Sequence, residues 1–584
     1  MIWIIFYLIS ITILVLAIVI AVASGLGKYK IGRVITPFNI MFGGVFLSTF
    51  MLIIPIQDFL VQDSLYKSLQ VTLFSLFNTI QIFVIEGETE LIDVSRNCPY
   101  DWVASAYNVN LSIYYVVAPI MSFVFLISFF KNVNSFFKYI NNYFNDVYIF
   151  SELSEKSLAL GSDIKAKNNK ALIVFTGLDE DTNEQQSEFI ERAKSIKAIC
   201  FTRDILAIDF KTHYKKSTIN FFSIDEDEKV NMIQGLKIIE EYKKMSNVRL
   251  YVFAIGVESE MLLAKTDYGC MKVRRVNEIK SLVNRTLYDE GEQLFDNAVP
   301  AEDGMKDISI VLVGLGRHGS EMMKGFIWYC QMDGYRLKID AFDENPEAED
   351  IIRGAVPELS HYDVTIHSGV NVNTKSFSDS IMGLDRTSFV FVCLDSDEMN
   401  IRTAVNMRML YERVGIKPVI QAVVKSSYEK KALEGITNYK GQSYDIRFIG
   451  DVESSYSADV IISSELEEEA LQRHLKWGEE EEFWRYEYNY QSSIASAIHL
   501  RARIHCGVAG ADKSDDELTE EERTIIESLE HRRWNAYMRT EGYVYSGSTD
   551  KSTRNDLGKM HHDLIEYDMM SDEEKRKDSK VGTR

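Results

Sequence analysis

The stretch DISIVLVGLGRHGSEMMKGF, Asp307–Phe326, determines the fold predicted for the larger part of the chain. Its apolar run Ile308–Val313 predicts a buried strand, and the residues after the glycines have helical spacing. Between strand and helix, Gly314, Gly316 and Gly319 form a G-x-G-x-x-G turn. This context is the one in which such glycines indicate a nucleotide-binding βαβ unit.

Each glycine of this turn has a predicted role. Gly314 takes the backbone angles of the turn, Gly316 leaves space for a phosphate, and Gly319 lets helix and strand pack closely. A second predicted strand, Leu337–Phe342, ends in Asp343, at about the 20-residue spacing of a ribose-binding acid. We therefore predict that these residues bind NAD or another adenine nucleotide. The alternative is a turn that only packs the unit.

Two further side chains lie inside the turn. Arg317 is predicted either to contact a phosphate or to be a solvated charge, and both interpretations stay open. His318 is not predicted to be a catalytic base, because no nucleophile or metal-ligand pattern accompanies it. We find no nucleophile elbow or P-loop, so we predict that the protein is not an enzyme.

Length and composition narrow the class of protein. A chain of 584 residues is expected to form three or more domains. The net charge of -22 argues against nucleic acid as a partner, since that requires a basic face. The six cysteines form no C-x-x-C pair, so neither zinc nor a disulfide framework is indicated, and no metal site is predicted.

Residues 1–130 form the predicted membrane part. Met1–Gly27, Val34–Gln57 and Trp102–Phe130 are free of charged residues, and each is long enough to cross about 30 Å of hydrocarbon as a helix. The segment Ser68–Ile85 is amphipathic and is predicted to lie in the interface or to re-enter. Gly43-Gly44 in the second span permits close helix packing.

The orientation of the spans follows from basic residues. Three spans with an outside N-terminus, or four with an inside N-terminus, both place the large C-terminal part in the cytoplasm. We therefore predict a multi-pass cell-membrane protein in contact with lipid. The basic residues used are Lys28, Lys30, Arg33, Lys131 and Lys138.

A stripe of hydroxyl side chains recurs along the amphipathic segment at helical spacing, at Ser68, Thr72, Ser75 and Thr79. The stripe is predicted either to line a pore or to form a helix-packing face. The three spans contain no charged residue and no potassium-type filter sequence, so channel activity is not evident from the membrane part alone.

Beyond a connector at residues 131–145, strand and helix patterns alternate in two copies, at residues 146–300 and 301–470. This alternation predicts an α/β fold of tandem, doubly wound parallel sheets. The copies match at an offset of roughly 170 residues, which indicates a tandem duplication. Where the second copy has its three glycines, the first has Ser151, Leu153 and Lys156. The first copy is therefore predicted to be structural or differently liganded.

The two copies resemble the TrkA N-terminal (RCK) domains that regulate potassium channels and transporters. The resemblance rests on the GLGRHG turn, on Asp343, and on Asp395-Ser396-Asp397-Glu398-Met399-Asn400 after the fourth predicted strand. It implies Rossmann-like units that bind nucleotides or cations and convert binding into domain movement. It also implies that Asp395 lies near the ligand and that the chain forms a homo-oligomer.

Residues 471–584 are predicted to form a mainly helical module that resembles a ryanodine-receptor (RyR) type domain. The matching motifs are EHRRWN, Gly542-Tyr543 and the later segment KMHHDLIEYD. The resemblance implies sensing of a nucleotide-derived signal, and in prokaryotes a defence setting. The alternative is a packed helix with one polar edge. The ligand candidates are His531, Arg533, Trp534, Tyr543 and His561, with Arg532 and Arg539 as further phosphate contacts.

The predicted function is that of a membrane-anchored nucleotide-sensing regulatory protein, in which ligand binding to the cytoplasmic domains is transmitted to the membrane helices. Two alternatives stay open. One is a potassium or other ion channel or transporter subunit gated by a nucleotide. The other is an NAD(P)-dependent enzyme built on the second Rossmann-like copy.

Overall fold

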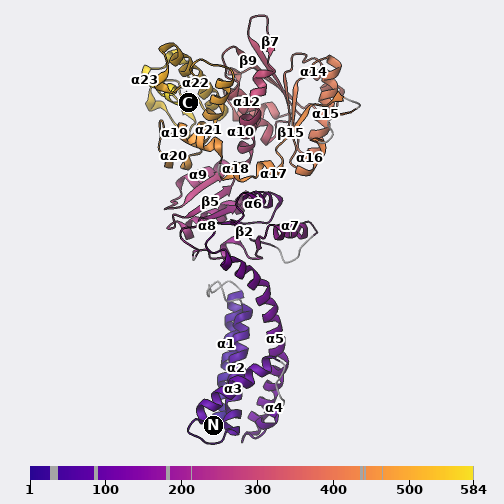
Figure 1. Cartoon of the computed structure of the whole chain (residues 1–584), viewed down its shortest axis with the longest axis vertical. Coiled ribbons are helices and arrows are strands. Elements are labelled where there is room, and N and C mark those ends of the chain that lie inside the picture. Colours follow the sequence, from indigo (N-terminus) through magenta and orange to yellow (C-terminus); the bar gives the residue numbers. More distant parts are fainter. Residues whose placement is uncertain are drawn as a thin grey trace. The chain divides into compact units, whose positions relative to one another are not determined.

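The computed structural model describes residues 1–25, 37–84, 90–178, 184–211, 213–434, 438–439, 442–462 and 464–582. The chain divides into two compact units, which are drawn in Figure 1. The helical unit comprises Met1–Phe144 with Leu206–Tyr214, and the α/β unit comprises Asn145–Ile205 with Lys215–Arg584. The basic residues 28, 30 and 33, used for the predicted orientation, lie outside the described residues.

Among the described residues, two helices are long and apolar enough to cross a membrane, over Ile2–Val22 and Ile40–Leu60. The third predicted span falls within the longest helix of this unit, of which the side chains of residues 124–141 are not described. The helices of the unit are α1 (Ile2–Gly25), α2 (Pro37–Leu60), α3 (Lys67–Val84), α4 (Glu90–Ser95) and α5 (Asp101–Asn141).

Helices α1 and α2 pack closely where both carry small residues. A Cβ atom on Gly44 would overlap the Cβ of Ala17, so a larger residue at Gly44 would push the two helices apart. Close by, the Ser10 and Ser48 hydroxyls lie 2.7 Å apart, and Ser48 also bonds the Tyr114 hydroxyl of α5 at 2.6 Å. The predicted close packing at Gly43-Gly44 is therefore confirmed at Gly44.

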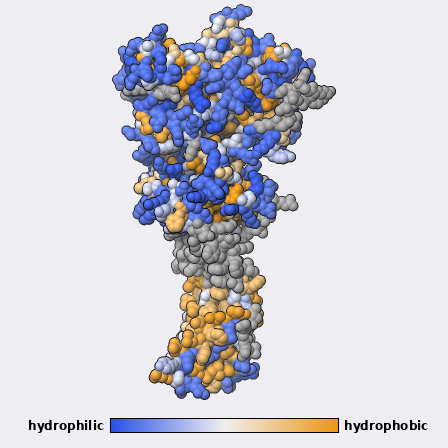
Figure 2. Space-filling view, viewed as in Figure 1, coloured by the Kyte–Doolittle hydropathy of each residue, from blue (hydrophilic) through white to orange (hydrophobic). Residues whose placement is uncertain are grey.

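Helix α3 has its polar face inward and its apolar face outward. Ser75 and Thr79 are buried, whereas Leu73 and Phe77 are exposed. This is the reverse of a helix on a soluble protein, and it suits a helix whose outer face contacts lipid. Figure 2 shows apolar residues covering much of the visible face of the helical unit. For Ser75 and Thr79, the arrangement favours the helix-packing interpretation of the hydroxyl stripe.

The α/β unit contains the two predicted parallel sheets. The first has the strand order β3-β2-β1-β4-β5-β6, and all its strand pairs are parallel. This is the doubly wound order of a dinucleotide-binding fold. Its strands are β1 (Val147–Phe150), β2 (Leu172–Phe175), β3 (Ile199–Cys200), β4 (Ile219–Ser223), β5 (Val248–Phe253) and β6 (Lys272–Val276).

The second sheet repeats the same order as β10-β9-β8-β11-β12-β15, with β7 (Val299–Pro300) added antiparallel to β8. The two sheets have the same order of equivalent strands, as expected of a tandem duplication. The strands are β8 (Lys306–Val313), β9 (Tyr335–Asp343), β10 (Val364–Ser368), β11 (Phe389–Val392), β12 (Val419–Val423) and β15 (Ile446–Ile449).

Helices alternate with the strands of both sheets and cover them (Figure 1). In the first copy they are α6 (Glu155–Lys167), α7 (Glu184–Ser195), α8 (Glu228–Tyr242), α9 (Val257–Lys265) and α10 (Glu278–Glu290), with α11 (Glu292–Asp296) before the second copy. In the second copy they are α12 (Arg317–Tyr329), α13 (Ala348–Ala355), α14 (Lys375–Met382), α15 (Asp397–Val414) and α16 (Ser427–Glu434).

Two short helices follow the second sheet but complete the core of the first. They are α17 (Val452–Ser455) and α18 (Ala458–Ile461). Tyr456 and Ile461 belong to the apolar core of the first sheet, and the Tyr456 ring stacks on Phe253 at 6.2 Å. The backbone N–H of Ala458 donates to the Asp163 carboxylate at 2.7 Å. The two copies are therefore packed into one another.

Residues 464–582, which include the described part of the predicted C-terminal module, are mainly helical and share an apolar core with the second sheet. Its two short strands, β16 (Val544–Tyr545) and β17 (Met560–His561), pair in parallel. Its helices are α19 (Glu465–His474), α20 (Glu480–Arg485), α21 (Glu487–His505), α22 (Glu520–Thr540) and α23 (Asp572–Gly582).

Candidate functional site

The glycine turn joins β8 to α12, and two of its glycines are required by sterics. Gly314 has φ +96°, and a Cβ there would overlap the Cys393 carbonyl after β11. A Cβ on Gly319 would overlap the Gly314 carbonyl. Both residues therefore allow α12 to start close against the sheet, as the sequence predicts.

Gly316 differs from these two glycines, because a Cβ there would meet no atom within 4 Å. It is the N-cap residue of α12, and both Gly316 and Arg317 are exposed. The turn lies at the carboxyl ends of the strands, at β8, which pairs with β9 on one side and β11 on the other. This is the topological switch point at which open α/β sheets bind ligands. Helix α12 therefore begins beside this open space, and a helix N-terminus favours anions.

Asp343 ends β9 and lies against the turn. One carboxylate oxygen accepts a hydrogen bond from the Leu315 backbone N–H at 2.6 Å, and the other accepts from Asn345 N–H at 2.8 Å. The predicted acid is therefore placed beside the glycines, at the position from which a ribose would be bound.

Asp395 is exposed after β11, whereas the neighbouring acid Asp397 is engaged with the next loop. The Asp397 carboxylate accepts hydrogen bonds from the backbone N–H groups of Lys425 (3.0 Å) and Ser426 (2.8 Å). Sequence reasoning did not assign this role to Asp397. The duplication could have indicated it, because the matching Glu228 accepts from Gly256 N–H at 2.6 Å.

His318 is half-buried, and burial lowers its pKa. The charges of Lys425 and Lys156 lower this pKa further, while Glu278 has the opposite effect. The imidazole is therefore neutral near pH 7. Lys156 and Glu278 come from the first copy, where they form an ion pair at 2.9 Å. The glycine turn of the second copy thus borders charged groups of the first.

The equivalent turn of the first copy is filled by its own side chains. The Ser151 hydroxyl accepts a hydrogen bond from Ile224 N–H at 2.9 Å, and Leu153 is buried in the first core. Burial, together with the nearby Asp225 and Glu226, raises the pKa of Glu152 to about 7. An acidic turn of this kind disfavours a pyrophosphate.

In the C-terminal module, three of the predicted ligand candidates meet. The Trp534 ring lies edge-on to His561 at 4.9 Å and 5.9 Å from the His531 ring. The Nε2 atom of His531 lies 2.8 Å from the Ile565 carbonyl, and its Nδ1 lies 3.2 Å from the Asp578 carboxylate. His531 and His561 are buried, so this cluster is an interior one.

Tyr543 joins the same cluster through an intermediate aromatic residue. Trp534 Nε1 donates to the Tyr488 hydroxyl at 3.4 Å, and the Tyr488 and Tyr543 rings lie 6.4 Å apart. Tyr543 is half-buried, and burial raises its pKa to about 12.

Arg533 occupies a different environment from these aromatic residues. It is buried and donates to Glu530 at 2.5 Å, and Arg503 of α21 lies 3.2 Å from the same carboxylate. The packed-helix interpretation is therefore favoured for Arg533.

The other two predicted phosphate contacts also have partners within the protein. Arg532 pairs with Asp333 at 2.7 Å and Arg539 with Glu358 at 2.8 Å. Both acids belong to the second copy, so these arginines attach the module to the second sheet.

The fold and the turn define an α/β protein with two consecutive sheets of dinucleotide-binding order, preceded by helices that could span a membrane. No family model and no curated protein matches the chain. Among solved structures, it is similar to the crystal structure of a GsuK mutant, with 13% identity and a TM-score of 0.34. That similarity covers 71% of this chain and 95% of the GsuK chain.

Proposed function

We propose that this protein is a membrane-anchored sensor that binds a nucleotide at the glycine turn of its second copy. The observation that carries the proposal is the open surface at Gly316. At this switch point of the sheet, the N-terminus of α12 and the Asp343 carboxylate lie beside space that no protein atom fills within 4 Å of a Cβ on Gly316. The ligand class that matches these three features is an adenine dinucleotide such as NAD.

Each part of the turn has a role in this proposal. The N–H groups at the start of α12 bind the pyrophosphate, and Arg317 neutralises part of its charge. When the nucleotide binds, the Asp343 carboxylate gives up the hydrogen bond from the Leu315 N–H and accepts hydrogen bonds from the ribose hydroxyls. Asp395 lies on the exposed edge beside the ligand. The protein performs no chemistry on the nucleotide.

Sensing requires the ligand to favour one arrangement of the protein over another. The first copy borders the turn through Lys156 and Glu278. A nucleotide phosphate beside His318 would add negative charge there. That charge would attract Lys156 and repel Glu278, and so weaken the ion pair between them. We propose that this change is passed to the membrane helices through residues 131–145, in a homo-oligomer.

The RyR-like resemblance leads to a second candidate for the sensing site. The observation in its favour is that Trp534, in contact with the buried His531 and His561, is partly exposed, and indole rings stack on nucleotide bases. In this version the module, rather than the glycine turn, binds a nucleotide-derived signal in a defence setting.

Thermal shifts of the full chain in detergent test the two sites against each other. NAD(H), NADP(H), ATP, ADP-ribose and cyclic nucleotides are added to the native protein and to Gly316→Asp. A ligand at 100 times its Kd should add about 2.7 kcal/mol of stability. The introduced carboxylate repels a phosphate at the turn, while an N-cap aspartate is compatible with the fold.

A shift that is lost in Gly316→Asp and kept in the control Gly354→Asp, at an exposed position of α13, supports the glycine turn. A shift that survives Gly316→Asp but is lost in Trp534→Leu moves the site to the C-terminal module. Conversion of the added NAD(H) or NADP(H) with any substrate would instead indicate an enzyme.

A further inference from the structure

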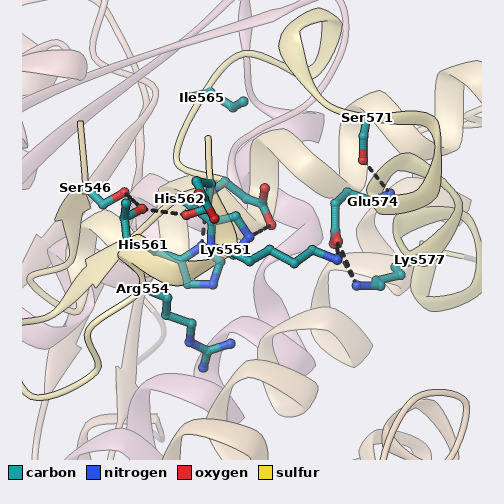
Figure 3. Close-up of polar contacts among 12 residues, drawn as sticks. Ser546, Lys551, Arg554, His561, His562, Ile565, Ser571, Glu574 and Lys577 are labelled. Atoms are coloured by element: carbon teal, nitrogen blue, oxygen red, sulfur yellow. Dashed lines mark hydrogen bonds and ion pairs between the residues drawn. The ribbon is translucent and has the colours of Figure 1, made fainter. Parts of the chain in front are cut away.

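The turn after β17 gathers three side chains that can bind a metal ion. His561, His562 and Asp563 are consecutive, the two histidines are buried and Asp563 is half-buried, and one donor atom from each lies within 4.8 Å of the others. Because β17 ends at His561, the chain turns there, and the two imidazole rings stack at 4.7 Å with 15° between their planes. Figure 3 shows both rings in the centre of the cluster.

His562 is buried beside Asp563. Its side chain is 7% exposed, and neither ring nitrogen has a hydrogen-bond partner among the described residues. Its Nε2 atom lies 3.2 Å from an Asp563 carboxylate oxygen. Burying an unsatisfied polar group costs free energy. Two ligands that are each about 2 Å from a shared ion can lie at this separation.

The backbone N–H of Asp563 donates to His561 Nδ1 at 3.1 Å. This hydrogen bond leaves Nε2 as the nitrogen of His561 that can bind an ion.

The nearby cationic side chains already have acidic partners. Lys551 and Lys577 both contact Glu574, as Figure 3 shows, and Arg554 pairs with Asp556 at 2.9 Å. The ion pairs of these three side chains are therefore with carboxylates other than Asp563.

We propose that His561, His562 and Asp563 bind one divalent ion of the zinc class. Two imidazoles and one carboxylate are ligands that zinc prefers over magnesium or calcium, and three protein ligands leave a fourth position for water. The site is independent of the glycine turn and of any nucleotide bound there, and it shares His561 with the second candidate site in the C-terminal module.

The location gives the ion a structural role. The carbonyl of Ile565, two residues after Asp563, accepts from Asn535 of α22 at 2.8 Å and contacts His531 Nε2. Arg539 of α22 donates to the Leu564 carbonyl and pairs with Glu358 of the second copy. An ion that fixes this turn would therefore fix α22 against the second copy.

Metal content of the full chain tests the proposal. The protein in detergent is stripped with a chelator, loaded with Zn²⁺ or Co²⁺, separated from free metal, and assayed for metal per chain. We expect about one equivalent of zinc in the native protein, a visible Co²⁺ spectrum typical of nitrogen and oxygen ligands, and a higher melting temperature with zinc.

The variants His562→Gln and Asp563→Asn should lose the bound zinc and the zinc-dependent rise in melting temperature. The control His505→Gln changes a partly exposed histidine paired with Asp296 and should keep both. Absence of stoichiometric zinc from the native protein, or retention of it in Asp563→Asn, overturns the proposal. If His562→Gln does not fold, the zinc content of Asp563→Asn and the Co²⁺ spectrum of the native protein test the proposal instead.

Discussion

Asn231 and Asn400 make the same three hydrogen bonds at equivalent positions of the two sheets. Each side chain accepts from and donates to the backbone of the second residue after the fourth strand, and each also donates to the carbonyl of the last residue of the fifth strand. The partners are Asp225 and Phe253 for Asn231, and Leu394 and Val423 for Asn400. Each asparagine therefore connects the ends of two strands to the helix between them.

Replacing either asparagine by alanine should destabilise the protein to a similar degree. The change leaves a buried N–H and buried carbonyls unpaired, at a cost of about 1–3 kcal/mol. Melting temperatures of Asn231→Ala and Asn400→Ala, compared with Asn297→Ala, where the asparagine is exposed, measure the effect. A loss in only one copy would show that the two networks are not equivalent.

Gly319→Ala should lower the melting temperature, because its Cβ would overlap the Gly314 carbonyl and separate α12 from the sheet. The matched change Gly354→Ala is at an exposed position of helix α13, where a Cβ meets nothing within 4 Å. There, alanine should stabilise the helix by up to about 1 kcal/mol. Equal melting temperatures for the two variants would contradict the steric argument.

Glu152 should make stability depend on pH in the neutral range. Its folded pKa is raised to about 7 by burial and by Asp225 and Glu226, against Lys156. An acid whose pKa is raised by folding keeps its proton to a higher pH in the folded protein than in the unfolded chain. The folded state therefore loses stability as pH rises from about 4.5 to about 7. Glu152→Gln should therefore melt higher than the native protein at pH 8 and similarly at pH 4.5, as differential scanning fluorimetry can show.

The Glu530 carboxylate lies between Arg503 and Arg533, all nearly completely buried. Glu530→Gln removes the negative charge that both guanidinium groups contact and should cost about 3–5 kcal/mol. Arg503→Met leaves Glu530 paired with Arg533 and should cost much less. Urea melting curves compare the two variants, and an equal loss in both would show that Arg503 is as necessary as Glu530.

Much of the fold could be predicted from the sequence, because its signals are local. The short apolar runs of both copies coincide with strands, and Gly314 and Gly319 have the steric roles expected of them. The glycine spacing and the Asp343 position depend only on the geometry of a βαβ unit.

The remaining features depend on contacts between distant parts of the chain. The partners of Arg532 and Arg539 are Asp333 and Glu358, roughly 200 residues away, and nothing local indicates them. The separation of Arg533 from His531 could have been predicted, since residues two apart on a helix face nearly opposite sides. The stacking of His561 on His562 could not, because it depends on where β17 ends.

The position of Tyr456 and Ile461 in the first core has a consequence for synthesis on the ribosome. The first sheet is complete by residue 276, yet its core lacks these two side chains until residue 461 has emerged. Domains generally fold in order from the N-terminus as they are made. The nascent first copy therefore has an exposed apolar surface until the whole second sheet has been translated. A chain truncated after residue 300 should for the same reason aggregate or recruit chaperones.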